Sequence, residues 1–314
     1  MRIALKVDVD TLRGTLEGVP ALLRLLDQYG VRATFLFSLG PDHTGRAIKR
    51  VFRPGFLSKV GRTSVASHYG IKTLLYGILL PGPHIGKRGA QVMRSVAAAG
   101  HETGIHTYDH VYWQDAVSTR DAAWTRAQME RARAVYQDIF QQPAHTHGAA
   151  GWQMNSHAFR LEEEYGFRYA SDCRGTQPFL PMIDGRVIAC PQLPTTLPTL
   201  DEVIWLNGWT EENVHEQILA CSLVSPAQSH VYTLHAELEG MRLLPALNKL
   251  LKGWRERGAD IGTTEDLFNT LDVSRLPVLP IVYGEIPGRS DDMALEGSLA
   301  SFDPALHCIS SGKS

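Results

Sequence analysis

The chain has 314 residues, of which 44% are hydrophobic and 20% are charged, so its composition is that of a globular protein with a buried core. Its formal net charge of -2 gives no indication of a nucleic-acid partner. No apolar run reaches the roughly 18 residues of a membrane span, and the N-terminus lacks the pattern of a signal peptide. The cysteines have no CxxC spacing, which argues against a zinc ribbon or a disulfide framework. We therefore expect a protein of a reducing, cytoplasmic compartment.

Strand and helix signals alternate along the chain, which favours an α/β fold built on a parallel sheet or barrel. The expected strands are Ile3–Val7, Ala33–Ser38, Glu102–His106, Ala144–Gly148, Phe167–Ala170, Val187–Ala189 and Val231–Leu234. The expected helices are Glu17–Tyr29, Gly89–Ala99, Ser118–Phe140, Ser156–Tyr165, Leu243–Arg257 and Thr264–Leu271, the last with Thr264 as its cap. We expect one domain over residues 1–287, with an insertion at about 44–88. Residues 288–314 are rich in Gly and Ser, and we expect them to be loosely ordered.

Ionisable side chains follow four of the expected strands. Asp8 and Asp10 come at the end of the first apolar run, and His106, Asp172 and His235 each follow a later one. The active site of a (β/α) barrel is built at the C-terminal ends of its strands. These residues are therefore expected to gather at one face of the barrel.

The segment His106–His110 has two histidines four residues apart, which would face the same way on one helical turn. With the carboxylate of Asp10 they would form a site for one divalent ion, and zinc, manganese, cobalt and iron suit such ligands equally well. Asp8 is a candidate general base, and His235, from a different strand, is a candidate general acid. Taken singly, each motif has an ordinary explanation as a packing or surface residue. Their joint occurrence at strand ends favours the catalytic interpretation.

Three segments resemble the motifs of the polysaccharide deacetylase superfamily, also known as the NodB-homology or carbohydrate esterase 4 group. They are KVDVDT (Lys6–Thr11), GHETGIHTYDH (Gly100–His110) and YTLHAE (Tyr232–Glu237). The resemblance implies a distorted (β/α) barrel of about seven strands, in which both histidines of the second segment bind the metal. It also implies that one aspartate of the first segment is the base and the other a ligand, and that the last histidine is the acid.

Two departures from the family pattern concern the catalytic base. Val9 separates two aspartates that are adjacent in the family, so the assignment of Asp8 as base and Asp10 as ligand is open to reversal. The family's third motif supplies an arginine that orients the base, but the corresponding segment Gly148–Trp152 contains none. Arg174 is the candidate to replace it.

The segments AAGW, YASDCRG and LPTTLPTLDEV resemble one branch of the family, which removes a formyl group from an amino sugar carried on undecaprenyl phosphate. This resemblance implies a role in lipid A modification and in resistance to cationic antimicrobial peptides. Trp152, Asp172 and Arg174 lie in these segments and are candidate substrate-binding residues. The alternatives are an N-deacetylase of polysaccharide or peptidoglycan, and a barrel that binds a polyprenyl-phosphate sugar without turnover.

Residues 44–101 contain ten lysines and arginines and no aspartate or glutamate, and the segment is also rich in apolar residues. A basic and apolar segment is typical of an element that binds an anionic membrane surface. We therefore expect peripheral attachment to the cytoplasmic face of the inner membrane, with Arg50, Arg53 and Lys59 contacting lipid or substrate phosphate. A solvated basic loop is the alternative.

Overall fold

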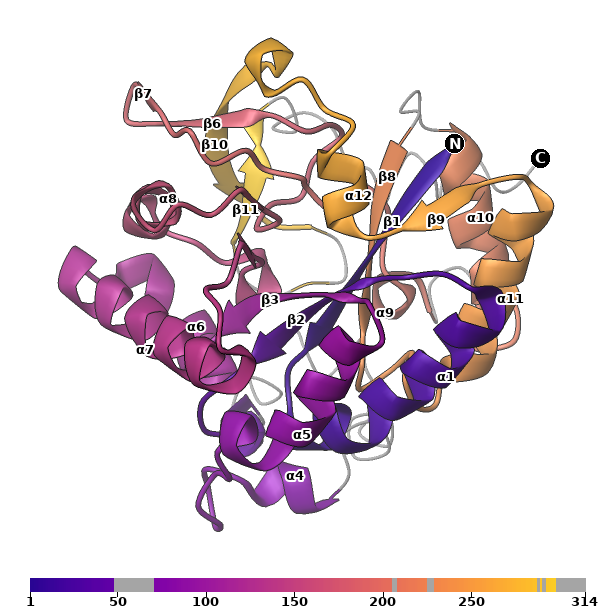
Figure 1. Ribbon diagram of the computed structural model, residues 1–314, viewed down its shortest axis with the longest axis horizontal. Coiled ribbons are helices and arrows are strands. Elements are labelled where there is room, and N and C mark those ends of the chain that lie inside the picture. Colours follow the sequence, from indigo (N-terminus) through magenta and orange to yellow (C-terminus); the bar gives the residue numbers. More distant parts are fainter. Residues whose placement is uncertain (48–70, 205–207, 225–228, 287–288, 290–291, 298–314) are drawn as a thin grey trace.

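The structure is a computed structural model that describes residues 1–47, 71–204, 208–224, 229–286, 289 and 292–297. Its centre is a seven-stranded sheet in the order β5-β4-β3-β2-β1-β8, with β9 pairing with the first residues of β1 (Figure 1). The strands are β1 (Arg2–Val9), β2 (Thr34–Ser38), β3 (Glu102–Thr107), β4 (Thr146–His147), β5 (Tyr169–Ala170), β8 (Ser229–His235) and β9 (Asp260–Gly262). All these pairings are parallel, so the carboxyl ends of the strands meet at one edge.

β1 is the central strand, with β2 on one side and β8 on the other. Apart from Arg2, every residue of β1 is buried. A parallel strand that is buried on both faces is expected to be a continuous apolar run. The segment RIALKVDV follows that rule except at Lys6 and Asp8, so these two buried ionisable residues call for a functional explanation.

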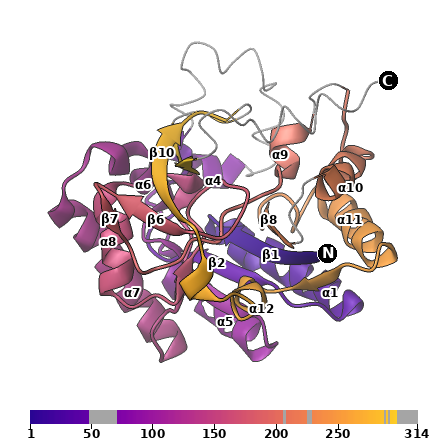
Figure 2. The same ribbon diagram turned by 90° about the horizontal axis from the view of Figure 1, so that it is seen from above.

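Helices cover the outside of the sheet, and in both views α10 and α11 lie side by side at the end of the molecule beyond β8 (Figure 2). The longer helices are α1 (Val19–Tyr29), α5 (Ile85–Ala98), α7 (Ala122–Phe140), α8 (Ser156–Glu164), α10 (Val214–Val224) and α11 (Leu244–Glu256). The shorter ones are α4 (Ile71–Leu75), α6 (His110–Ala116), α9 (Leu200–Val203) and α12 (Thr264–Phe268), with a π-helical turn at Gly14–Gly18.

Capping side chains set the starts of α7 and α12. α7 begins at Ala122, not at Ser118, because the side chain of Asp121 accepts a hydrogen bond from the backbone N–H of Trp124. α12 is capped by Thr263, which forms a capping box with Asp266, so the prediction of Thr264 as cap is wrong by one residue.

A second sheet of four strands lies at the end of the molecule opposite α10 and α11 (Figure 1). Its order is β11-β10-β6-β7, with β6 (Leu180–Ile183), β7 (Arg186–Val187), β10 (Val278–Gly284) and β11 (Met293–Glu296). The strand expected at Val187–Ala189 thus belongs to this sheet and not to the barrel. Residues of β6 and β11 are part of the main hydrophobic cluster, so the two sheets share one core.

The predicted fold class, a distorted (β/α) barrel of about seven strands, is confirmed. The expectation of a loosely ordered tail is wrong for Met293–Glu296, which are buried in β11, while residues 298–314 lie outside the described residues. Within the expected insertion, Ile71–Leu75 is helical and α5 begins at Ile85. Arg50, Arg53 and Lys59 lie outside the described residues. No helix in the described part of the chain is long and apolar enough to cross a membrane.

Candidate metal centre and active site

The ionisable residues of three strands meet at the carboxyl edge of the main sheet. Asp8 is near the end of β1, with Asp10 directly after the strand, His106 is in β3, and His235 ends β8. Asp8 and His235 are Cα partners in the register of β1 and β8. β3 is reached from β1 across β2, on the side away from β8, so His106 and His235 flank the aspartates from opposite sides. Of the strand-end residues, only Asp172 lies elsewhere.

Asp10, His106 and His110 form a group that is able to hold a metal ion. Oδ1 of Asp10 lies 3.2 Å from Nε2 of His106 and 3.4 Å from Nε2 of His110. The expected single helical turn is wrong, because His106 belongs to β3 and His110 is the first residue of α6. The change from strand to helix occurs at Asp109, whose side chain caps α6 by accepting from the N–H of Tyr112. The two imidazoles converge through this turn, with ring centroids 5.2 Å apart.

The protonation of His106 shows why this group fits a cation. Its Nδ1 lies 2.6 Å from the carbonyl oxygen of Gly148, which can only accept, so Nδ1 carries the proton. In the neutral ring Nε2 then presents a lone pair to Oδ1 of Asp10. That oxygen is buried and has no hydrogen-bond partner among the described residues. Two facing lone pairs repel each other, and a divalent ion between them removes the conflict with a nitrogen and oxygen donor set common for transition metals.

The charge state of Asp10 suits a ligand. Burial by itself would raise its pKa, but positive charge on the facing imidazoles of His110 and His106 outweighs burial and lowers the pKa below its ordinary value. A divalent ion held between neutral imidazoles and Asp10 would supply that positive charge in their place. A carboxylate that stays ionised at this position supplies the negative charge that a divalent cation needs.

Glu237 fixes the backbone that carries Asp10. Its Oε1 accepts hydrogen bonds from the N–H of Asp10 at 3.1 Å and from the N–H of Thr11 at 2.8 Å. The carboxyl group packs directly on Gly14, where an added Cβ would lie 1.9 Å from Oε1. Glu237, in the loop after β8, thus fixes the loop after β1. Gly14 has no side chain that would block this contact.

Asp8 lies outside the metal-holding group. Its Oδ2 is 3.4 Å from Nζ of Lys6, and both side chains are buried. Its Oδ1 lies on the side of His106, 3.9 Å from Nδ1 of that ring, and has no hydrogen-bond partner in the described part of the chain. Because Asp10 contacts both histidines and Asp8 does not, the geometry favours Asp10 as ligand and Asp8 as base.

A neighbour that the sequence did not indicate, Asp201, affects the protonation of His235. Nδ1 of His235 lies 4.0 Å from Oδ1 of Asp201, the second residue of α9, and Asp201 is itself 3.0 Å from the guanidinium of Arg289. Burial would lower the pKa of His235, but the carboxylates of Asp201 and Asp10 outweigh burial and raise it. A histidine that keeps its proton beyond its ordinary pKa is suited to donate that proton.

Two candidate substrate-binding residues are buried, so their assignment is corrected. Arg174 is 1% exposed and forms a 2.5 Å ion pair with Glu202, so it neither contacts substrate nor orients Asp8. Trp152 is also 1% exposed, and its indole N–H donates to Oγ1 of Thr195. Its ring lies 6.5 Å from that of His235, so Trp152 supports the acid from below the surface.

The assignment of Asp172 to substrate is also wrong, because Asp172 is fully buried in a cluster with His147 and Glu162. Nδ1 of His147 lies 2.8 Å from Asp172 and 2.9 Å from Glu162. The amide of Gln192 donates to the second oxygen of each carboxylate. Hydrogen bonds thus occupy the atoms that a metal would need. We interpret the cluster as a structural link between β4, the segment after β5, and α8.

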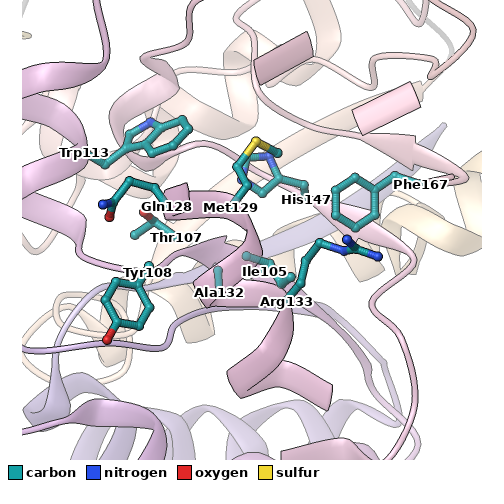
Figure 3. Close-up of a pocket in the computed structure, with 10 residues that line it drawn as sticks. All are labelled: Ile105, Thr107, Tyr108, Trp113, Gln128, Met129, Ala132, Arg133, His147 and Phe167. Carbon is teal, nitrogen blue, oxygen red and sulfur yellow. The ribbon is translucent and has the colours of Figure 1, made fainter. Parts of the chain in front are cut away.

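A small pocket lies beside this cluster, and Figure 3 shows the residues that line it; none of the candidate metal ligands is among them. Its wall includes Ile105 and Thr107, which alternate with His106 along β3 and so point to the other face of the sheet. The ring of His147 lies beside Met129 and Phe167 in this pocket. Its volume of about 10 Å³ has room for no more than one water molecule.

Comparison with known proteins places the chain in a family. A model of the polysaccharide deacetylase family matches residues 2–170. A relative from Shewanella sediminis, named probable 4-deoxy-4-formamido-L-arabinose-phosphoundecaprenol deformylase ArnD, is 34% identical over 95% of each chain. A relative of the same name from Wigglesworthia glossinidia brevipalpis is 32% identical over 90% of this chain and 98% of its own. This protein belongs to the polysaccharide deacetylase family and is a hydrolase of amide bonds.

The solved structures agree on the fold. A structure of a polysaccharide deacetylase homologue from Mycobacterium smegmatis superimposes with a TM-score of 0.63. The match covers 91% of this chain and 94% of that chain at 19% sequence identity. At this identity the similarity shows the shared barrel alone.

Four residues at or beneath the site escaped the sequence analysis: Lys6, Asp201, Glu237 and Arg289. Lys6 could have been found, because residues 6, 8 and 10 share one face of an extended chain and all three are ionisable. The other three lie on loops or a short helix, where no periodic pattern marks them.

Proposed function

We propose that this protein is a metal-dependent deformylase. It hydrolyses the N-formyl group of undecaprenyl-phosphate 4-deoxy-4-formamido-L-arabinose to give the free amino sugar and formate, in lipid A modification and polymyxin resistance. The observation that carries the catalytic part is the group of Asp10, His106 and His110, whose facing nitrogen and oxygen atoms suit a divalent cation near Asp8. The substrate is supported by the names of two relatives that match nearly the whole chain.

In this proposal the residues divide the work by position. A divalent ion held by Asp10, His106 and His110 would polarise the formyl carbonyl and acidify the attacking water. Asp8 accepts the proton of that water on Oδ1, the oxygen without a partner in the described structure. His235 gives its proton to the sugar nitrogen as the C–N bond breaks, which its raised pKa favours. The products are formate and the free amine.

We also propose that the protein works at the cytoplasmic face of the inner membrane, where a polyprenyl carrier holds its head group. Support comes from the described part of the insertion, where Ile78, Leu79 and Leu80 are 47%, 76% and 40% exposed. Contiguous exposed apolar residues next to basic ones suit a membrane interface. The acid-free segment 44–101 supplies those basic residues.

A short series of contacts links the exposed apolar turn of Ile78, Leu79 and Leu80 to the metal group. Gly77, at its start, accepts a hydrogen bond from Nε of Arg46 and packs on His43. Nδ1 of His43 lies 2.6 Å from the carboxylate of Asp109, the residue that caps α6 directly before His110. A membrane bound at the turn would therefore hold the carrier close to the site.

The substrate is tested by comparing formate and acetate release from one carrier. Purified protein is given the undecaprenyl-linked sugar in its N-formyl form, in its N-acetyl form, and, in a third reaction, a peptidoglycan oligosaccharide. We expect turnover of the N-formyl form above the others. Turnover of the oligosaccharide at an equal rate would indicate a polysaccharide N-deacetylase instead, and binding of the carrier with no turnover would indicate a binding barrel.

A further inference from the structure

In the buried ion pair of Lys6 and Asp8, the ammonium lies next to one particular oxygen of the carboxylate, and this bears on catalysis. Lys6 is 0% exposed, and its ammonium lies 3.4 Å from Oδ2 of Asp8 and donates to the carbonyl oxygen of Ser171 at 2.9 Å. The face of Trp152 lies 5.4 Å from the same nitrogen. The ammonium is therefore surrounded by a carboxylate, a carbonyl and an aromatic face, which together suit a buried cation.

The two oxygens of Asp8 consequently have different surroundings. Oδ2 is held by Lys6, while Oδ1 lies 3.9 Å from Nδ1 of His106, a residue of the metal group, and is buried without a hydrogen-bond partner among the described residues. A carboxylate attached through rotatable bonds has no preferred oxygen until a charged partner fixes its plane. Lys6 is that partner, because it lies two residues earlier on the same face of β1.

We propose that Lys6 is a positioning residue for the catalytic base. Its ammonium holds Oδ2 of Asp8, so that Oδ1 is presented to the metal group as the proton acceptor. The inference rests on the proposed function, since it takes Asp8 as the base. It also explains why this chain tolerates the absence of an arginine in Gly148–Trp152. The cation beside the base comes from β1 itself, and Arg174 is committed to Glu202.

The test is a double-mutant cycle on formate release. Lys6→Met removes the charge at similar length, and we expect kcat to fall about tenfold, a part of the roughly 10²- to 10⁴-fold that a positioned base contributes. KM and bound metal should change little, because Lys6 contacts neither the metal group nor an open surface. Lys6→Arg restores the charge and should recover most of kcat. In an Asp8→Asn background, Lys6→Met should lower kcat no further.

Control variants separate positioning from folding. Lys6→Gln keeps a donor for Ser171 and serves as the neutral variant if Lys6→Met does not fold. Glu102→Gln alters a largely buried hydrogen-bond group at the opposite end of the sheet, and should lower the melting temperature while leaving kcat unchanged. An equal loss of kcat from Lys6→Met with and without Asp8 would overturn the proposal, as would unchanged kcat in the neutral variants. If the wild type releases no formate, the proposed function fails first, independently of Lys6.

Discussion

Asp8 and His235 are Cα partners on the adjacent parallel strands β1 and β8. The candidate base and acid are therefore held at one level of the sheet by backbone hydrogen bonds, and not by flexible loops. The metal group of Asp10, His106 and His110 lies beside them, and its two histidines come from the β3 side. This arrangement separates the roles of the residues, so substitutions should separate them too.

The charges around His235 predict opposite shifts of the alkaline limb of the rate profile. The acid must be protonated, so kcat/KM falls as pH rises through the pKa of His235. Asp201 raises this pKa and Arg289 lowers it. Asp201→Asn should therefore move the alkaline limb to lower pH, and Arg289→Gln should move it to higher pH. The pH dependence of kcat/KM for both variants checks this, and shifts in the same direction would contradict the role of His235 as acid.

The contact of Gly14 with Glu237 predicts a loss of metal affinity in Gly14→Ala. A methyl group 1.9 Å from Oε1 of Glu237 would displace the carboxylate that holds the N–H groups of Asp10 and Thr11. We expect metal affinity to fall about tenfold or more, the usual effect of disturbing a ligand's support. Titration with the metal measures it. Gly258→Ala is the control, because it strains a positive φ at a position with no neighbour to displace.

The buried cluster of His147, Glu162 and Asp172 predicts that the protein is less stable at pH 9 than at pH 7. Burial opposes a charged imidazole, but Asp172 and Glu162 outweigh it and raise the pKa of His147 to about 10. Burial, followed by the charge of Asp172, raises the pKa of Glu162 well above its usual range. The folded protein therefore keeps protons that the unfolded chain releases as pH rises above its ordinary histidine and glutamate values, and stability declines in that window.

Denaturant unfolding at pH 7 and pH 9 measures this decline. Glu162→Gln replaces a carboxyl that shares the cluster's protons by a neutral amide that cannot titrate, and should reduce the difference in unfolding free energy between the two pH values. Glu164→Gln, an exposed change on the same helix, should leave the difference as in the wild type. A wild type that is more stable at pH 9 would contradict a proton-holding cluster.

The membrane proposal predicts salt-sensitive binding to anionic vesicles. Each lysine or arginine near such a surface contributes about 1 kcal/mol, and salt screens the attraction. Replacing Arg50, Arg53 and Lys59 by Glu should weaken sedimentation with vesicles and leave activity on a short soluble analogue intact. The matched control replaces Lys249, Lys252 and Arg255 by Glu, which makes the same change of charge on α11. Equal sedimentation of the first variant and the wild type would favour a solvated loop.

The positions of the strand-end residues could be predicted because apolar strands end where ionisable residues begin. That pattern located Asp8, Asp10, His106 and His235 without knowledge of the turns between them. The turn at His106–His110 was wrong in detail, since the sequence does not state where β3 stops and α6 starts. The predicted set of ligands was unaffected, because Asp109 caps the helix at the turn that brings both imidazoles to Asp10.

The residues that support the site could not be predicted, because each is defined by a partner far along the chain. Asp172 and Arg174 also follow a strand, but Glu162 and Glu202 respectively meet them in the interior. Arg289 comes from a tail whose composition indicated loose order, although its guanidinium contacts Asp201. Whether a polar residue faces substrate or a buried partner is decided by tertiary packing, which local patterns do not encode.

The most direct test measures metal content and formate release in the same preparations of wild type, Asp8→Asn and Asp10→Asn. We predict that the wild type loses activity on chelation and regains it when a divalent ion is restored. Asp8→Asn should keep its metal yet lose about 10²-fold or more in kcat, while Asp10→Asn should lose metal and activity together. Loss of the metal in Asp8→Asn with retention in Asp10→Asn would reverse the two roles. Full activity of the chelated wild type would contradict the metal-dependent account itself.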